Sequence, residues 1–170
     1  MKIRYFFYEI SSPANEIRPA VSYIFRSAHL IHAPNSVRYA YSKYLFSSLE
    51  SDFNDNRFGA FDEVLKAINL VENGEIDNFI YDGQGFTHEI FRNHVLFEHS
   101  IFGVCPHWPL WSCSLSQYKI AIQGWMKFLQ TPESLDTELI MELPESDMAK
   151  IAIFPPKLFE NEAAKEASHD

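Results

Sequence analysis

Four residues that commonly bind zinc lie within fifteen positions of one another: His99, Cys105, His107 and Cys113. A structural zinc site needs four such donors converging at about 2.0–2.3 Å from the metal. The single residue between Cys105 and His107 matches none of the usual ligand spacings. Two prolines, Pro106 and Pro109, also stiffen this connection. We therefore expect no metal and no cofactor, and we expect these side chains to pack against Trp108 and Trp111.

If this loop is catalytic, Cys105 or Cys113 would be the nucleophile. Thiol catalysis needs a neighbouring histidine as base and a donor for the oxyanion. Nothing nearby in the sequence orients either thiol, and a free cysteine is more often a small buried apolar residue. We expect no catalytic residue and two free thiols. A small thiol- or zinc-dependent hydrolase using the Cys105–Cys113 loop is the alternative function.

Two further motifs are better explained by structure than by chemistry. Gly83-Gln84-Gly85 lacks the Lys-Ser/Thr of a phosphate-binding loop and precedes a predicted strand rather than a helix. It fits the turn of a β-hairpin, where glycine allows unusual backbone angles. Asp62 and Glu63 fall in the first turn of a predicted helix, where carboxylates favourably meet the helix dipole.

The middle of the chain predicts a β-hairpin followed by one amphipathic helix. Residues 79–81, 86–91 and 94–99 read as strands separated by polar turns. Ser114 and Gln117 form a capping-box pattern at the start of a helix over residues 115–129, with Trp125 buried. Two more strands are expected, at residues 137–143 and 151–154.

The N-terminal half predicts mainly helices. Residues 2–10 resemble a strand, although a helix could use them equally well. Helical spacing of apolar residues predicts helices after Pro19, after Asn35 or Ser36, and over residues 61–71, with Gly74 as a C-terminal cap. The helix after Pro19 rests on a stripe of four residues: Val21, Ile24, Phe25 and Ala28.

These elements predict an α+β fold, with a helical N-terminal half and a small antiparallel sheet, the central hairpin, packed against an amphipathic helix. We expect residues 1–158 to form a single globular domain and residues 159–170 to form a flexible acidic tail.

Charge is distributed unevenly along the chain. The net charge is −9, and residues 51–98 carry ten acidic and three basic residues, a balance of −7. Such a surface argues against nucleic-acid binding, which depends on basic side chains, and it permits a basic protein partner. No window approaches the roughly 20 apolar residues of a membrane span, and no secretory segment is evident. We expect a cytoplasmic protein.

Several sequence features resemble small bacterial immunity proteins, particularly those of contact-dependent growth inhibition and related polymorphic-toxin systems. The resemblance covers about residues 77–144 and rests on four runs: Asp82-Gly-Gln-Gly-Phe-Thr-His-Glu-Ile, Ser114-Leu-Ser-Gln-Tyr, Gln123-Gly-Trp-Met-Lys-Phe-Leu and Glu142-Leu-Pro. It implies a non-enzymatic cytosolic protein that binds and neutralises one cognate toxin domain. Because immunity surfaces diverge with their toxins, the resemblance assigns no binding residue. A housekeeping adaptor protein is a further alternative.

The acidic segment from residue 52 to residue 82 is the predicted contact surface for the toxin, which we expect to be a basic nuclease. Its carboxylates would replace the phosphates that a nuclease normally meets. The predicted partner-binding residues fall at helix ends and turns: Asp52, Asp55, Glu72, Glu75, Asp77 and Asp82.

Overall fold

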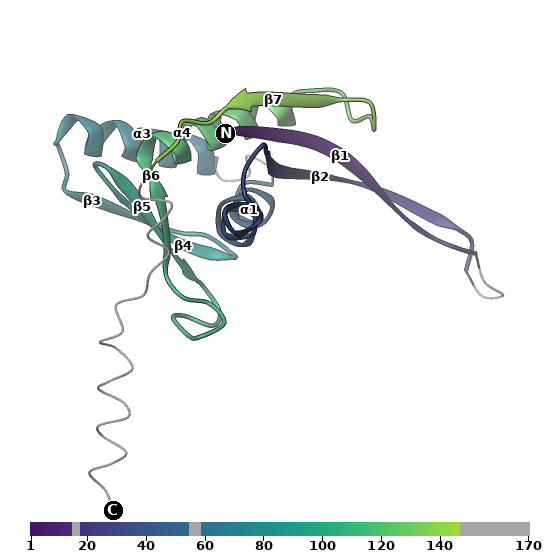
Figure 1. Cartoon of the computed structure of the whole chain (residues 1–170), viewed down its shortest axis with the longest axis horizontal. Helices are drawn as coiled ribbons and strands as arrows, with labels where there is room; N and C mark the ends of the chain where they lie inside the picture. Colours follow the sequence, from purple (N-terminus) through teal and green to yellow (C-terminus); the bar gives the residue numbers. More distant parts are fainter. Residues whose placement is uncertain (15–17, 55–58, 147–170) are drawn as a thin grey trace, which may run out of the picture.

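A computed structural model describes residues 1–14, 18–54 and 59–146 of the chain (Figure 1). Within them, two antiparallel sheets have the strand orders β2-β1-β7 and β3-β4-β5-β6, here called sheet A and sheet B. Sheet A consists of β1 (Lys2–Ser12), β2 (Val21–Ile31) and β7 (Glu138–Glu142). Sheet B consists of β3 (Asn78–Asp82), β4 (Phe86–Phe91), β5 (His94–His99) and β6 (Trp111–Ser114).

In the part of the chain that the structure describes, three helical segments accompany the sheets. The first is continuous and comprises α1 (Asn35–Tyr41), a π-helical turn η1 (Ser42–Phe46) and α2 (Ser47–Asp52). The second is α3 (Ala60–Asn73) and the third is α4 (Leu115–Leu129). Among the described residues, no helix is long and apolar enough to cross a membrane.

The predicted fold class is wrong, because the N-terminal half begins with two long strands before its helices, and the described residues form two antiparallel sheets rather than one small sheet. The expected helix after Pro19 is instead β2, which pairs with β1 from Val21↔Ser12 to Ile31↔Lys2. The apolar residues of β2 that share a helical spacing lie on both faces of the strand. Tyr23, Ile24 and Phe25 favour a strand intrinsically, and the long ladder with β1 decides between the two structures.

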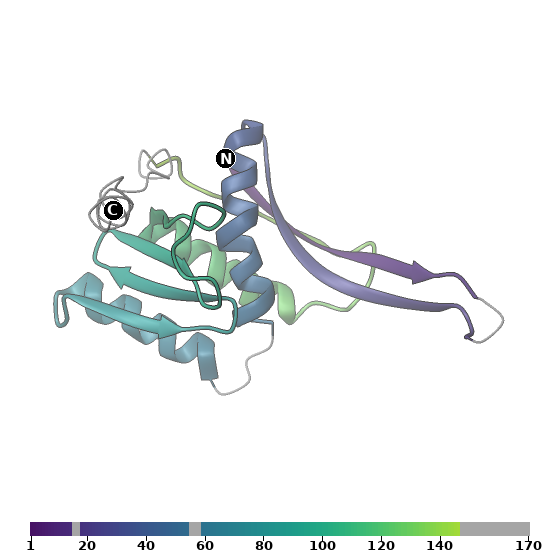
Figure 2. The same ribbon diagram turned by 90° about the horizontal axis from the view of Figure 1, so that it is seen from below.

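Sheet A extends from the body of the protein as a long arm. β7 pairs with β1 only between Lys2 and Phe6, so the remainder of β1 is paired with β2 alone. Figures 1 and 2 show this two-stranded ribbon projecting well beyond the helices and sheet B.

Several predicted elements are confirmed. The helix over residues 115–129 has the predicted bounds, and both hydrogen bonds of the Ser114–Gln117 capping box are present. The third helix ends at Gly74, whose φ of 73° is the left-handed conformation expected of that cap. The hairpin strands β4 and β5 pair as predicted, and β7 lies within the expected strand at residues 137–143. The expected strand at residues 151–154 and the tail lie outside the described residues.

The core forms where α4 packs against β1 and the end of α2. Trp125 is fully buried, as predicted, and its indole nitrogen donates a hydrogen bond to the Phe53 carbonyl at 2.8 Å. The hydroxyl of Tyr5 donates to the Ala121 carbonyl at 3.0 Å. Gly124 allows this close approach, because a Cβ there would overlap the Tyr5 hydroxyl and the sulfur of Met141.

Candidate partner-binding surface

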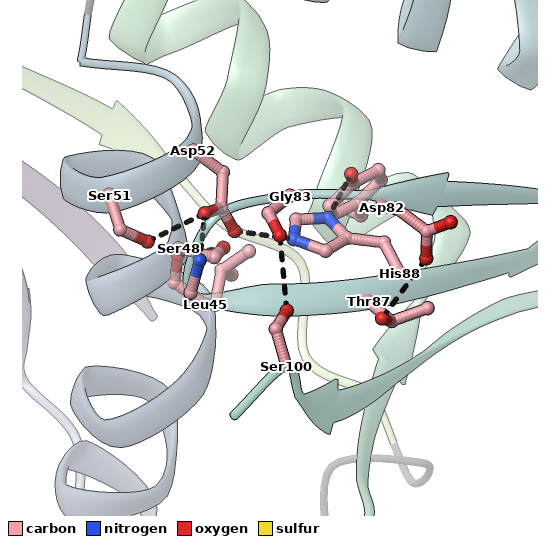
Figure 3. Close-up of polar contacts among 11 residues, drawn as sticks. Leu45, Ser48, Ser51, Asp52, Asp82, Gly83, Thr87, His88 and Ser100 are labelled. Carbon is pink, nitrogen blue, oxygen red and sulfur yellow. Dashed lines mark hydrogen bonds and ion pairs between the residues drawn. The ribbon is translucent and has the colours of Figure 1, made fainter. Parts of the chain in front are cut away.

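A fully buried polar network joins three elements beneath one end of sheet B. His88 on β4 faces Asp52, at the end of α2 (Figure 3). On its other side, His88 contacts Tyr118 on α4. Its Nε2 is 3.0 Å from the Oδ2 of Asp52, and its Nδ1 is 2.6 Å from the Tyr118 hydroxyl. Burial raises the pKa of Tyr118 well above its ordinary value, so the phenol keeps its proton. A neutral imidazole satisfies both contacts when Nδ1 accepts from Tyr118 and Nε2 donates to Asp52.

The same carboxylate fixes the turn between β3 and β4. The other oxygen of Asp52, Oδ1, accepts hydrogen bonds from the Gly85 N–H at 2.6 Å and from the Ser51 hydroxyl at 2.9 Å. A Cβ at Gly83 would overlap the Asp52 carboxylate, and one at Gly85 would overlap the Ser51 hydroxyl. The two glycines of the turn are therefore required by close packing.

The geometry of this network favours positioning over catalysis. The side chains of Asp52 and His88 have no exposed surface, so no substrate reaches them. Both imidazole nitrogens are already occupied, and the Ser51 hydroxyl bonds to Asp52 rather than to His88. The network holds β3 and β4 in place and so determines where their outward-facing side chains lie.

Those outward-facing side chains form the candidate surface. Viewed from below, the strands of sheet B lie in front of α3 and α4, which cover its inner face (Figure 2). Among the described residues, no helix lies in front of β3 and β4 in this view. The ladder places Ile80 opposite Glu89, Asp82 opposite Thr87, and Thr87 opposite Glu98. We call the following set the acidic face: Ile80, Asp82, Thr87, Glu89, Leu96 and Glu98.

The acidic face combines negative charge with exposed apolar surface. Asp82 accepts from the Thr87 hydroxyl at 3.2 Å, and Glu89 accepts from the Asn78 amide at 2.7 Å, which holds both carboxylates in place. Ile80 lies between them with 55% of its surface exposed. The six residues of the acidic face include no lysine or arginine. Burial lowers the pKa of nearby His94, despite an opposing effect of Glu89, so it adds no positive charge at neutral pH.

The structure separates the predicted contact residues into groups. Asp52 is buried in the polar network, and Glu72 is paired with Lys119 of α4 at 2.5 Å. Glu75 and Asp77 are exposed in the turn between α3 and β3, and Asp82 is exposed on the acidic face. Asp55 lies outside the described residues.

Glu89 and Glu98 were not among the predicted contact residues, although both belong to the acidic face. The strand alternation places Glu89 on the face opposite His88 and Ile90, which is a sequence signal for exposure. Its position beside Asp82 depends on the pairing of β3 with β4. That register is a property of the folded sheet, and it brings together carboxylates that are distant in the sequence.

The candidate metal and thiol residues do not converge. No group of three or more potential metal-binding side chains occurs among the described residues. Cys113 is buried on β6, where burial raises the pKa of its thiol far above the usual range, whereas Cys105 is partly exposed in the loop and both thiols are free. The rings of His99 and Trp108 contact each other at a tilt of 54°, with centroids 4.2 Å apart. The Nδ1 of His99 accepts backbone hydrogen bonds, and His107 is exposed.

Comparisons with protein-family models, with curated proteins and with solved structures find no match to this chain.

Proposed function

We propose that this chain is an immunity protein that binds a cognate toxin domain, a basic nuclease, and neutralises it. The observation that carries this proposal is the acidic face: Asp82, Glu89 and Glu98 on the same face of sheet B. Glu75 and Asp77 extend the negative charge into the turn before β3. The resemblance at about residues 77–144 supports it further, since that stretch contains all of sheet B and α4.

The acidic face has the chemistry needed to occupy a nuclease. A nuclease binds phosphates with basic side chains, and carboxylates at fixed positions can engage the same groups. Long-range attraction between opposite charges speeds encounter and disfavours partners of the wrong sign. Because hydrogen bonds already hold Asp82 and Glu89, less side-chain entropy is lost on binding. Ile80 adds the apolar contact that acidic side chains alone would lack.

Inhibition in this proposal requires no chemistry by the chain itself. The bound chain covers the substrate-binding surface of the toxin and excludes nucleic acid from it. A cytoplasmic location belongs to the same proposal, because a toxin that enters the cell meets its nucleic-acid substrate there.

The hydrolase alternative has weaker support. A nucleophilic cysteine needs an accessible thiolate beside a base. Burial keeps the Cys113 thiol protonated, and the imidazole of His99 is engaged with Trp108 and with backbone N–H groups.

On this proposal, a gene beside that of this chain encodes a protein with a toxic C-terminal domain, and the test uses that domain. Cells that express this domain are scored for growth with the parent chain and with the triple variant Asp82→Asn/Glu89→Gln/Glu98→Gln. We expect the triple variant to lose protection and to associate at least about tenfold more slowly at low salt. For the parent, association should slow as salt rises, because the Debye length shortens from about 10 Å at 0.1 M to about 3 Å at 1 M.

The matched control removes three carboxylates elsewhere: Glu9→Gln/Asp136→Asn/Glu145→Gln. All three residues are exposed, so both triple variants change the net charge equally. Equal effects of the two variants would mean that total charge matters and the acidic face does not. The function itself is wrong if the purified chain neither binds nor protects against the neighbouring toxic domain.

A further inference from the structure

The outer half of the β1–β2 arm carries an uncovered apolar strip. Cross-strand pairing places Tyr8 opposite Phe25 and Ile10 opposite Tyr23, with Val21 next along the same face. Tyr8 and Phe25 stack at 5.5 Å between ring centroids, and Tyr23 contacts Phe25 at 6.3 Å. We call these five residues the arm strip. Their exposed fractions are high for large apolar side chains: Tyr23 58%, Ile10 50%, Phe25 41% and Val21 36%.

The arm has little else to stabilise it. β7 stops pairing with β1 at Phe6, so the outer arm is a two-stranded ribbon that projects from the body (Figures 1 and 2). An isolated two-stranded ribbon is at best marginally stable in water. Near the base of the arm, Glu50 of α2 covers the edge of β2, where it accepts from the Ser27 hydroxyl and the Ala28 backbone. The outer arm therefore gains stability from any surface that covers its apolar face.

We infer that the arm strip is covered by the arm strip of a second copy of this chain, related by a two-fold axis. No residue of the strip is charged at neutral pH, so a two-fold contact places no like charges opposite each other. This matters for a chain of net charge −9, whose copies repel one another elsewhere. The strip also lacks the carboxylates of the acidic face, so the basic toxin proposed above is not its natural occupant.

The size of the strip predicts a reversible dimer. With ~200 Å² for an aromatic side chain and somewhat less for Ile and Val, the exposed fractions amount to roughly 350 Å² per copy. A pair buries roughly twice that area, below the approximately 1,200 Å² at which standard stable interfaces begin. Backbone and flanking side chains of the two ribbons add to this area. We expect a dissociation constant on the order of 10 μM.

The first test is the mass of the full chain by analytical ultracentrifugation between about 1 and 500 μM. We expect the mean mass to rise from 19.7 kDa toward twice that value. Tyr23→Lys should shift the midpoint of this transition at least about tenfold to higher concentration. The control is Ile24→Lys, at the next residue on the opposite face, where Glu9 is its cross-strand partner; it should leave the midpoint unchanged.

A second measurement needs no variant and covers the case in which Tyr23→Lys disturbs the arm. Hydrogen exchange of the backbone amides from residue 21 to residue 26 should slow as the concentration of the parent chain increases. A chain that stays monomeric at about 500 μM overturns the proposal. So does a monomer whose arm amides become protected only with phosphatidylcholine vesicles, which would identify a lipid surface as the occupant. Equal effects of the two lysine variants would also overturn it.

Discussion

The imidazole of His88 and the carboxylate of Asp52 meet at 3.0 Å with neither side chain exposed, although they are 36 residues apart in the sequence. This contact ties the end of the first helical segment to the second strand of sheet B. Since Asp52 also accepts from the Gly85 N–H, one buried carboxylate sets both the position of a helix end and the shape of a turn. The acidic face begins immediately beside that turn, at Asp82.

Removal of this carboxylate should be costly. In Asp52→Ala, the Gly85 N–H and a nitrogen of His88 lose their acceptor inside the protein, where unpaired polar groups are expensive. We expect the free energy of unfolding to fall by about 3 kcal/mol, measured by urea denaturation. Asp82→Asn is the control and should change it by less than about 0.5 kcal/mol, since Asp82 is exposed. A near-neutral Asp52→Ala would show that the network contributes little.

Trp125 should be among the most sensitive positions of the core. Trp125→Ala removes a fully buried indole and its hydrogen bond to Phe53. The expected loss of unfolding free energy is about 3–5 kcal/mol. Lys127→Ala, on the exposed side of the same helix, provides the baseline. Similar losses for both variants would contradict the described packing of α4.

Gly124→Ala should destabilise the protein, although alanine is the better helix former by about 1 kcal/mol. The added methyl group would collide with the Tyr5 hydroxyl, which is held by its bond to the Ala121 carbonyl. We expect a net loss of about 1–3 kcal/mol, seen as a lower midpoint in urea. Gln123→Ala, at the exposed neighbouring position, should be neutral or slightly stabilising. A gain in stability from Gly124→Ala would mean that β1 does not approach α4 this closely.

The folded chain should be sensitive to mild acid. Burial lowers the pKa values of His29 and His94, and Arg4 and Arg38 lower that of His29 further. The unfolded chain then binds protons that the folded chain does not, so the free energy of unfolding decreases as the pH falls below about 6.5.

Urea denaturation between about pH 7.5 and 5.5 measures this slope. His29→Gln/His94→Gln should flatten it, whereas His107→Gln, at an exposed position in the loop, should not. An unchanged slope in the double variant would assign the acid sensitivity to other groups.

Local patterns predict the second half of this fold better than the first. The helix over residues 115–129 carries its own start signal in Ser114 and Gln117 and its own apolar stripe, so a short window of sequence is sufficient. By contrast, the spacing of Val21, Ile24, Phe25 and Ala28 also fits a helix. The pairing with β1 makes this segment a strand, and a short stretch of sequence around residues 21–31 does not reveal that pairing.

The candidate surface could likewise be predicted only in part from the sequence. The acidic balance of residues 51–98 is visible in the sequence and identifies the region. The sequence does not show which of these carboxylates are exposed. Asp52 and Asp82 belong to the same acidic segment, but Asp52 is buried and Asp82 is exposed. Asp52 is drawn inside because His88 and the Gly85 N–H provide partners for it there. Those partners become neighbours of Asp52 only after folding.

The central place of β1 in sheet A has a consequence for the order of events during protein synthesis. β1 emerges from the ribosome before β7, its neighbour on one side, which follows more than a hundred residues later. The Arg4–Glu138 ion pair between them spans a separation of 134 residues. At about 5–20 residues per second, β1 waits on the order of ten seconds for this neighbour. During that interval one edge of an aromatic-rich strand stays open to pairing with other chains. A nascent chain of this protein should therefore depend on chaperones most strongly before residue 138 is made.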